Sequence, residues 1–211
     1  MPIGSLIGLE NCRKVVLNYN LIPVSHVKLL TGQEKNGVSG PLTDRYYSFS
    51  YTNKANPKEE GGFFCGYTIG ERLLDLINHK PIPLFNPLAS DPIQNNDGQN
   101  NRLERPDSTN RQIKRCKKNQ QFWVAINLLC CGWNKPPYGI LAESLQYIQN
   151  LPNVETKNWP IISLNNFLKS RNETLKSIYD RLAEKNNMKE YEFDELIMAL
   201  KAEEKENHIW P

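Results

Sequence analysis

The chain has 211 residues, of which 39% are hydrophobic and 23% charged, and its formal net charge is +3. These values are typical of a soluble globular protein of one large or two small domains, which buries enough surface to fold without a disulfide or a metal. The net charge is too small to indicate a partner. No stretch reaches the roughly 20 apolar residues that span a bilayer, and the N-terminus lacks the pattern of a signal peptide.

The N-terminal segment predicts two helices followed by a loop. Apolar residues spaced among polar ones indicate a helix over residues 5–19. Residues 25–30, after Pro23, indicate a short helix that ends at Gly32. Glycine and proline in residues 33–44 are typical of a loop.

Residues 45–52 alternate in the way of a β-strand. Tyr47, Phe49 and Tyr51 are expected on one side of this strand, and Tyr46 and small polar residues on the other. A polar turn follows, so we expect a hairpin with a long loop over residues 45–67.

Two segments resemble each other, because each has an apolar strand, a Cys-Gly-aromatic corner, a short helix and a proline. They span residues 63–81 and 121–152, and the strand of the second is expected over 121–129. The corner glycines Gly66 and Gly132 are expected to have a positive φ. The resemblance has two interpretations: a duplication, or the coincidence that is common among strand-turn-helix segments.

The C-terminal third is predicted to be helical and acidic. Ser163 is placed as the N-cap of a first helix, whose apolar residues continue to Leu182, and a second helix is expected from about Glu190 to Glu206. Residues 184–206 contain eight acidic and four basic side chains. This composition is typical of a solvated helix face, or of a docking surface for a protein partner or a second copy of the chain.

The fold class that follows is α+β: a small antiparallel or mixed sheet with packed helices and a helical C-terminal third. We divide the chain into an N-terminal α+β part (1–88), a polar basic loop or linker (89–120), and a strand followed by C-terminal helices (121–211). The first and last parts can belong to one domain.

Positive charge is concentrated between Arg102 and Lys118, where seven basic and two acidic residues give +5. Lysine and arginine clusters bind phosphates, and aromatic side chains beside them can stack on bases. The residues expected to bind nucleic acid are therefore Arg111, Lys114, Arg115, Lys117, Lys118 and Trp123. The competing interpretation is a solvated basic loop.

A nuclease is the first enzymatic alternative. Asp107, Glu155 and Lys157 spell the letters of a PD-(D/E)xK site, in which carboxylates hold a divalent cation and lysine stabilises charge. That chemistry needs these residues on adjacent strands, whereas Asp107 is predicted in a polar loop.

The five cysteines are best interpreted as buried structural thiols. Their number is odd, Cys130 and Cys131 are adjacent, and no Cys-x2-Cys pair occurs, so neither a disulfide framework nor a zinc site is expected. A nucleophile at Cys65 or Cys131 needs a histidine partner, and His79 is expected at the far end of the helix after Cys65. We therefore expect a reducing, cytoplasmic setting, no bound metal and no cofactor.

The sequence favours a cytoplasmic, nucleic-acid-associated binding or regulatory protein, with no membrane partner. One alternative is a metal-dependent nuclease or another nucleotide-acting enzyme. The other is a protein inhibitor or adaptor that acts by protein–protein contact. The sequence contains no Walker loop, GxGxxG, His-Glu-x-x-His or GxSxG motif, so it does not decide whether the protein is an enzyme.

Overall fold

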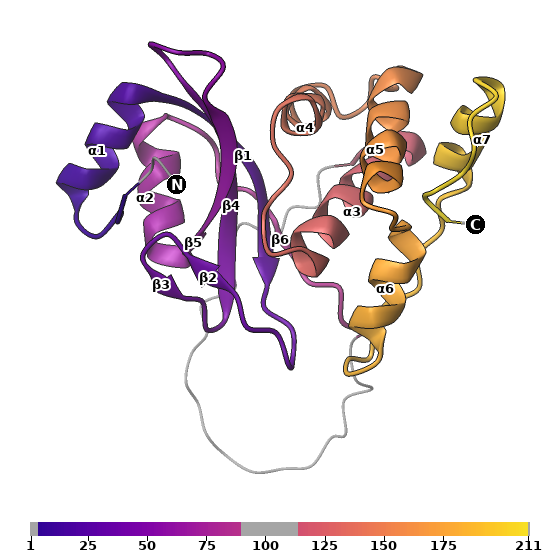
Figure 1. The fold of residues 1–211 in the computed structure, drawn as a ribbon, viewed down its shortest axis with the longest axis horizontal. Helices are drawn as coiled ribbons and strands as arrows, with labels where there is room; N and C mark the ends of the chain where they lie inside the picture. The colour runs from indigo at the N-terminus through magenta and orange to yellow at the C-terminus, as the bar shows by residue number, and fades with distance from the viewer. Residues whose placement is uncertain (1–3, 90–113, 211) are drawn as a thin grey trace.

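The computed structural model describes residues 4–89 and 114–210, and Figure 1 shows its fold. A four-stranded mixed sheet has the order β5-β4-β1-β6, and β2 and β3 form a separate pair. The strands are β1 (Tyr19–Lys28), β2 (Asn36–Gly37), β3 (Gly40–Pro41), β4 (Arg45–Asn53), β5 (Glu60–Gly66) and β6 (Leu84–Phe85). The helices are α1 (Leu9–Asn18), α2 (Tyr67–Leu76), α3 (Lys117–Gly132), α4 (Ile140–Asn150), α5 (Asn158–Ser170), α6 (Leu175–Ala183) and α7 (Asp194–Ala202).

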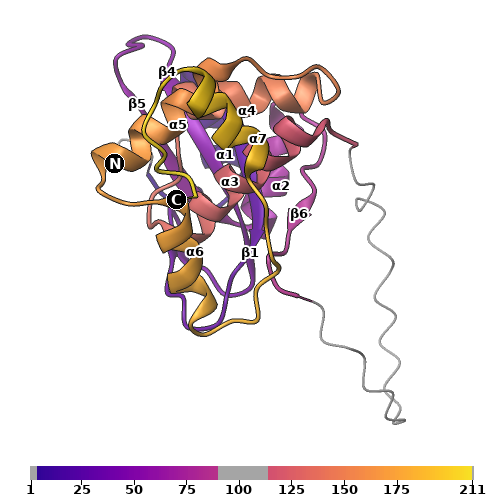
Figure 2. The same ribbon diagram turned by 90° about the vertical axis from the view of Figure 1, so that its right-hand side faces the viewer.

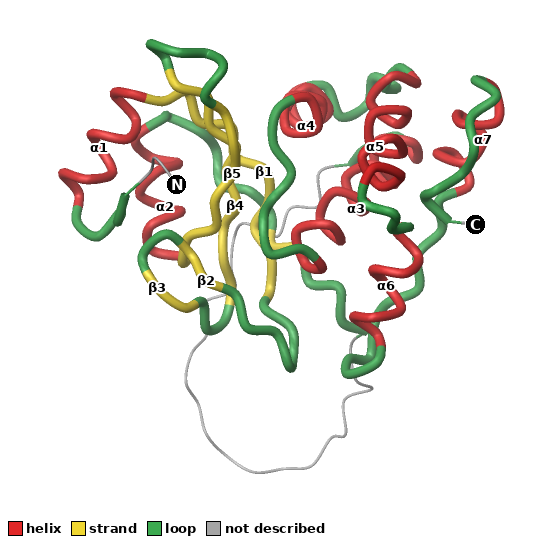
Figure 3. Tube along the Cα trace, viewed as in Figure 1, coloured by secondary structure: helices red, strands yellow, loops and turns green. Residues whose placement is uncertain are grey.

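The four-stranded sheet lies between two helical layers (Figures 1 and 3). α1 and α2 cover one face, and α3 to α7 lie on the other. Each face of the sheet has its own cluster of buried apolar residues, and the larger cluster joins residues of β1 and β4 to the C-terminal helices. The expected α+β class, with a small mixed sheet and a helical C-terminal part, is confirmed.

β4 is buried on both faces, which explains its aromatic content. Tyr47 and Phe49 belong to the cluster beneath α1 and α2, whereas Tyr46 belongs to the cluster on the α3 side. β4 pairs antiparallel with β5, where Phe49 lies opposite Phe63 and their rings stack with centroids 5.5 Å apart. The hairpin expected over residues 45–67 is confirmed.

β1 replaces the short helix expected over residues 25–30. It pairs antiparallel with β4 along its whole length and parallel with β6. Val24 and Val27 are fully buried, and β-branched residues of this kind favour strands. Pro23 lacks an N–H and stands at the register shift between Pro23 and Ser25, where a strand tolerates proline. The helix prediction was wrong because so short a segment has no period that separates a helix from a buried strand.

α3 replaces the strand expected over residues 121–129. Every residue from Gln121 to Cys131 is buried, with the sheet on one side and α4, α6 and α7 on others. A helix buried all round carries no polar stripe, so its 3.6-residue period is absent from the sequence. Apolar residues at alternate positions of this segment therefore gave a wrong strand prediction. The second strand-corner-helix unit does not exist.

The two corner glycines serve different purposes, and neither has a positive φ. Gly66 precedes α2 with a φ of −64°, and a Cβ there would have no atom within 4 Å. Gly132 ends α3 where α6 crosses it, and a Cβ there would lie 2.3 Å from Cγ2 of Ile178. The prediction of positive φ was wrong, and Gly132 instead permits the close packing of two helices.

The C-terminal part contains three helices where the sequence predicts two. The chain turns at Asn172, which has a φ of 53°, and Thr174 then caps α6 by accepting a hydrogen bond from the Ser177 N–H at 2.9 Å. Ser163 lies inside α5 and is not its N-cap. The last helix, α7, is shorter than expected.

None of the helices in residues 4–89 and 114–210 combines the length and the apolar character needed to cross a bilayer. Even α3, the most deeply buried of them, has only 16 residues.

Replacing Gly132 tests the helix crossing. We expect Gly132→Ala to lower the free energy of unfolding by about 1–3 kcal/mol, because the added methyl group overpacks the contact with Ile178. Gly66→Ala is the control and should cost less, because the added methyl group meets no atom within 4 Å and only the preference of the α2 N-cap for glycine over alanine is lost. Urea denaturation of both variants measures the difference, and equal stabilities would contradict the close approach at Gly132.

Candidate functional site

A buried amide joins the start of α3 to the connection between α4 and α5. Asn119 is fully buried, and its Nδ2 donates to the carbonyl oxygens of Pro152 at 3.0 Å and Val154 at 2.8 Å. Its Oδ1 accepts from the Thr156 N–H at 2.9 Å. The Cys116 N–H also donates to Pro152, at 3.1 Å. Two segments far apart in the sequence are therefore held side by side.

We call the resulting surface the α3–α5 face. Its charged members are five cations and two anions. Further carboxylates border it, because Glu192 and Glu195 act electrostatically on Lys117 and Glu203 accepts a hydrogen bond from Asn158 at 3.0 Å. Its apolar members are four large exposed side chains. The face consists of Lys114, Arg115, Lys117, Lys118, Tyr147, Leu151, Val154, Glu155, Lys157, Trp159 and Asp194.

Two of the predicted phosphate-binding lysines form ion pairs. Lys117 Nζ lies 2.6 Å from Asp194, and this hydrogen bond raises the lysine pKa and lowers that of the carboxyl. Lys118 Nζ lies 3.1 Å from Glu155 and donates to Asn158 at 2.8 Å. The Lys117 side chain is 56% exposed and that of Lys118 only 11%, so Lys117 is the more accessible.

Trp123 lies in the core and not at the surface. It is 9% exposed, and its ring meets that of Phe85 edge-on with centroids 5.3 Å apart. The Arg115 guanidinium lies over the Trp123 ring, 4.7 Å from its centre. Partial burial lowers the pKa of this arginine. Of the other predicted residues, Lys114 is exposed and Arg111 lies outside the described residues. Their role in nucleic-acid binding stays a prediction.

Trp159 is the exposed aromatic residue of this face, and the sequence reasoning overlooked it. It lies in the first turn of α5, is 46% exposed, and follows Asn158, the partner of Lys118. The signal that was available is its setting, since it is a tryptophan directly after Lys157 and Asn158 in a polar stretch.

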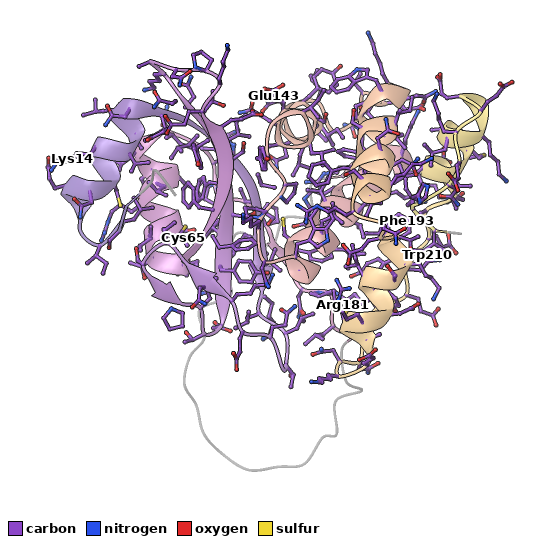
Figure 4. The ribbon with its side chains drawn as sticks, viewed as in Figure 1. Lys14, Cys65, Glu143, Arg181, Phe193 and Trp210 are labelled. Atoms are coloured by element: carbon purple, nitrogen blue, oxygen red, sulfur yellow. The ribbon has the colours of Figure 1, made fainter. Side chains whose placement is uncertain are left out.

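A polar cleft of about 250 Å³ lies where α3 and α6 end near the loop after β1. Arg181, labelled on α6 in Figure 4, is one of the residues that line it. The Asn186 side chain accepts from the Thr31 N–H at 3.0 Å and so ties the two walls together. The cleft is lined by Thr31, Gly32, Gln33, Glu34, Lys35, Cys131, Gly132, Asn134, Arg181, Leu182, Glu184, Lys185 and Asn186.

Lys35 at the wall of this cleft caps the C-terminus of α3. It is 4% exposed, and its Nζ donates to the carbonyl oxygens of Cys130, at 2.9 Å, and Trp133. Tyr46 also donates to Cys130, at 2.9 Å, and Gln33 to Cys131, at 2.7 Å. Burial lowers the pKa of Lys35 to about 8. The helix end explains this lysine, because cations near a C-terminus satisfy its unpaired carbonyls.

The residues of the nuclease pattern do not lie on adjacent strands. Glu155 is exposed and paired with Lys118, and Lys157 is the N-cap position of α5, so both lie in a loop. Asp107 lies outside the described residues. Within residues 4–89 and 114–210, no group of three histidine, cysteine or acidic side chains is arranged to hold a metal.

The cysteines are free thiols, four of them buried. Burial raises the pKa of Cys65, Cys130 and Cys131, which keeps these thiols protonated and unreactive at neutral pH. Cys130 and Cys131 are consecutive residues of α3 and do not alternate across a strand. The nearest cysteine to solvent is Cys116, just before α3.

Residues 6–207 match the family model described as "Uncharacterised conserved protein UCP028583", so the chain belongs to this family. Neither a curated protein nor a solved structure matches the chain.

The pKa of Lys35 predicts a dependence of stability on pH. Between its folded pKa of about 8 and the ordinary value of 10.5, the unfolded chain still holds a proton that the folded protein has released. The contribution of Lys35 to stability is therefore largest above pH 10.5 and is lost as the pH falls through 8. We expect the stability of the wild type relative to Lys35→Met to rise by up to about 3 kcal/mol across this window.

Urea denaturation at several pH values measures this difference. Lys14→Met, which removes an exposed lysine of α1 (Figure 4), is the control and should give a difference that is independent of pH. A flat difference for Lys35→Met would show that Lys35 is not the desolvated cap described above.

Proposed function

We propose that the protein is a binding or regulatory protein that contacts nucleic acid through the α3–α5 face. The observation that supports this most strongly is the link made by Asn119, which ties the loop before α5, where Lys157 lies, to the start of α3, where Lys117 lies. Cations from both segments then share one surface with exposed apolar side chains. Phosphates are bound by such clusters through the release of counterions.

The ion pairs of the face are compatible with phosphate binding. Exposed pairs such as Lys117–Asp194 contribute little to stability, because water and salt screen them. A phosphate can therefore compete with the Asp194 carboxylate for Lys117. Lys118 is less accessible, and its pair with Glu155 positions the α4–α5 connection.

The cellular setting belongs to the same proposal. All five cysteines are free, which suits a reducing compartment, and we place the protein in the cytoplasm on this ground.

A protein partner is the second candidate, favoured by α7. Met198 is exposed on this helix, 53% of its surface being accessible, and acidic residues such as Glu192 and Glu195 lie nearby in the chain. An apolar anchor beside negative charge suits a basic protein partner. This surface adjoins the α3–α5 face, because Asp194 at the start of α7 pairs with Lys117 and Glu195 acts on the same lysine. Met198 is therefore the residue whose replacement separates the two candidates.

Binding of labelled nucleic acid across a salt series tests the leading proposal. Affinity should fall as salt rises, because phosphate contacts release counterions. Each of Lys114→Ala, Lys117→Ala and Lys157→Ala should weaken binding and reduce the slope of log K against log salt by up to about 1. Lys14→Ala, on α1 behind the sheet, is the matched control and should leave the slope unchanged.

Two results would contradict the proposal. One is the absence of binding even at low salt. The other is a triple variant of Lys114, Lys117 and Lys157 that binds as tightly as the wild type.

A further inference from the structure

Four large apolar side chains are exposed on the α3–α5 face. Tyr147 and Leu151 are four positions apart at the end of α4 and so lie on the same side of it. Figure 4 labels Glu143, which is one turn before Tyr147 and lies on the top of α4, away from the helical body. Val154 and Trp159 continue the exposed apolar surface toward α5.

The fold itself gives no reason for Trp159 to be a tryptophan. α5 packs on the body through Pro160, Ile161, Leu164 and Leu168, all of which are buried. Trp159 is not among these contacts, and its ring is 46% exposed. A large exposed aromatic side chain among cations is instead typical of a surface that binds a ligand.

The position of Trp159 relative to the cations matches the chemistry of a single strand. Lys157 is two residues before it, and Lys118 donates to Asn158, the residue that adjoins it. In a single strand, charged phosphates alternate with bases whose flat faces are free to stack on aromatic rings. In a duplex, neighbouring base pairs cover those faces, so the protein contacts phosphates, sugars and base edges but cannot stack a ring on a base.

We propose that the α3–α5 face prefers single-stranded nucleic acid, with Trp159 stacking on a base while Lys114, Lys117 and Lys157 contact the backbone. This inference rests on the proposed function and adds the class of nucleic acid and the stacking residue. Tyr147 is the second aromatic ring of the face. The exposed Glu155 carboxylate repels the phosphates of the nucleic acid and so limits affinity.

The test compares labelled single strands of about 12 nucleotides, oligo-dT and oligo-U, with a duplex of the same length. The wild type should bind the single strands more tightly. Trp159→Ala should weaken single-strand binding by about 5- to 100-fold, the range expected for loss of one stacked base, and leave duplex binding unchanged. Trp159→Phe, which keeps a ring, should recover most of the loss.

Two further variants sharpen the result. Leu17→Ala removes an apolar side chain that is more exposed than Trp159 from α1, behind the sheet, and should have no effect. Glu155→Gln removes the opposing charge and should tighten binding of both strand types several-fold, with a steeper salt dependence.

Tryptophan fluorescence distinguishes stacking from a purely structural role of Trp159, because only stacking changes the emission upon binding. Stacking on a base should quench the wild-type emission upon addition of oligo-dT, and Trp159→Phe should abolish the quenching while it still binds. Trp123 and Trp133, which are buried, and the partly buried Trp210 also emit, and Trp159→Phe measures their combined background.

The outcomes separate this inference from the function on which it rests. If neither strand type binds, the proposed function fails, and the inference fails with it. If single strands and duplex bind equally and Trp159→Ala binds like the wild type, phosphate binding stands and the preference for single strands is overturned.

Discussion

The structure depends on the burial of α3 from nearly every side. The sheet covers one side of this helix, and α4, α6 and α7 contact others. Such burial requires the polar groups of the helix to find partners inside the protein. Gln121, itself buried, meets this requirement where α3 touches α7, since its Nε2 donates to Asp194 at 2.5 Å and its Oε1 accepts from the Glu195 N–H at 2.9 Å. At the other end, Lys35 and Tyr46 donate hydrogen bonds to the carbonyl oxygen of Cys130.

The two ends of α3 therefore differ electrostatically. At the C-terminus, the negative end of the helix dipole is neutralised inside the protein by Lys35, which accounts for the charged groups around the polar cleft. At the N-terminus, the positive end of the dipole is at the surface and adds to the charges of Lys114 and Lys117. Asp194 and Glu155 offset part of this charge. The proposed function has the phosphates of a nucleic acid compete with these carboxylates for the lysines.

The sequence predicts the outer elements of this fold better than its centre. The β4–β5 hairpin follows from alternation, and α1 from apolar residues on one side of a helix. α3 does not follow, because a helix buried all round has no polar stripe, and its alternation from Phe122 to Leu128 is a coincidence of composition. β1 was missed for a related reason, since its pairing partner, β4, lies far along the chain.

The candidate site shows the same limit. The basic cluster is visible in the sequence, but its aromatic partner is not the nearest one along the chain. Because residues 121–129 form a helix, Trp123 turns inward beneath Arg115. Asn119, about one turn earlier on the same helix, instead holds the loop before α5 against the start of α3. No local pattern encodes that contact, because the Asn119 amide pairs with backbone groups, which every residue carries. The sequence thus shows that basic residues gather near the start of α3. It does not show that the loop before α5 joins them, because that depends on the buried Asn119 side chain.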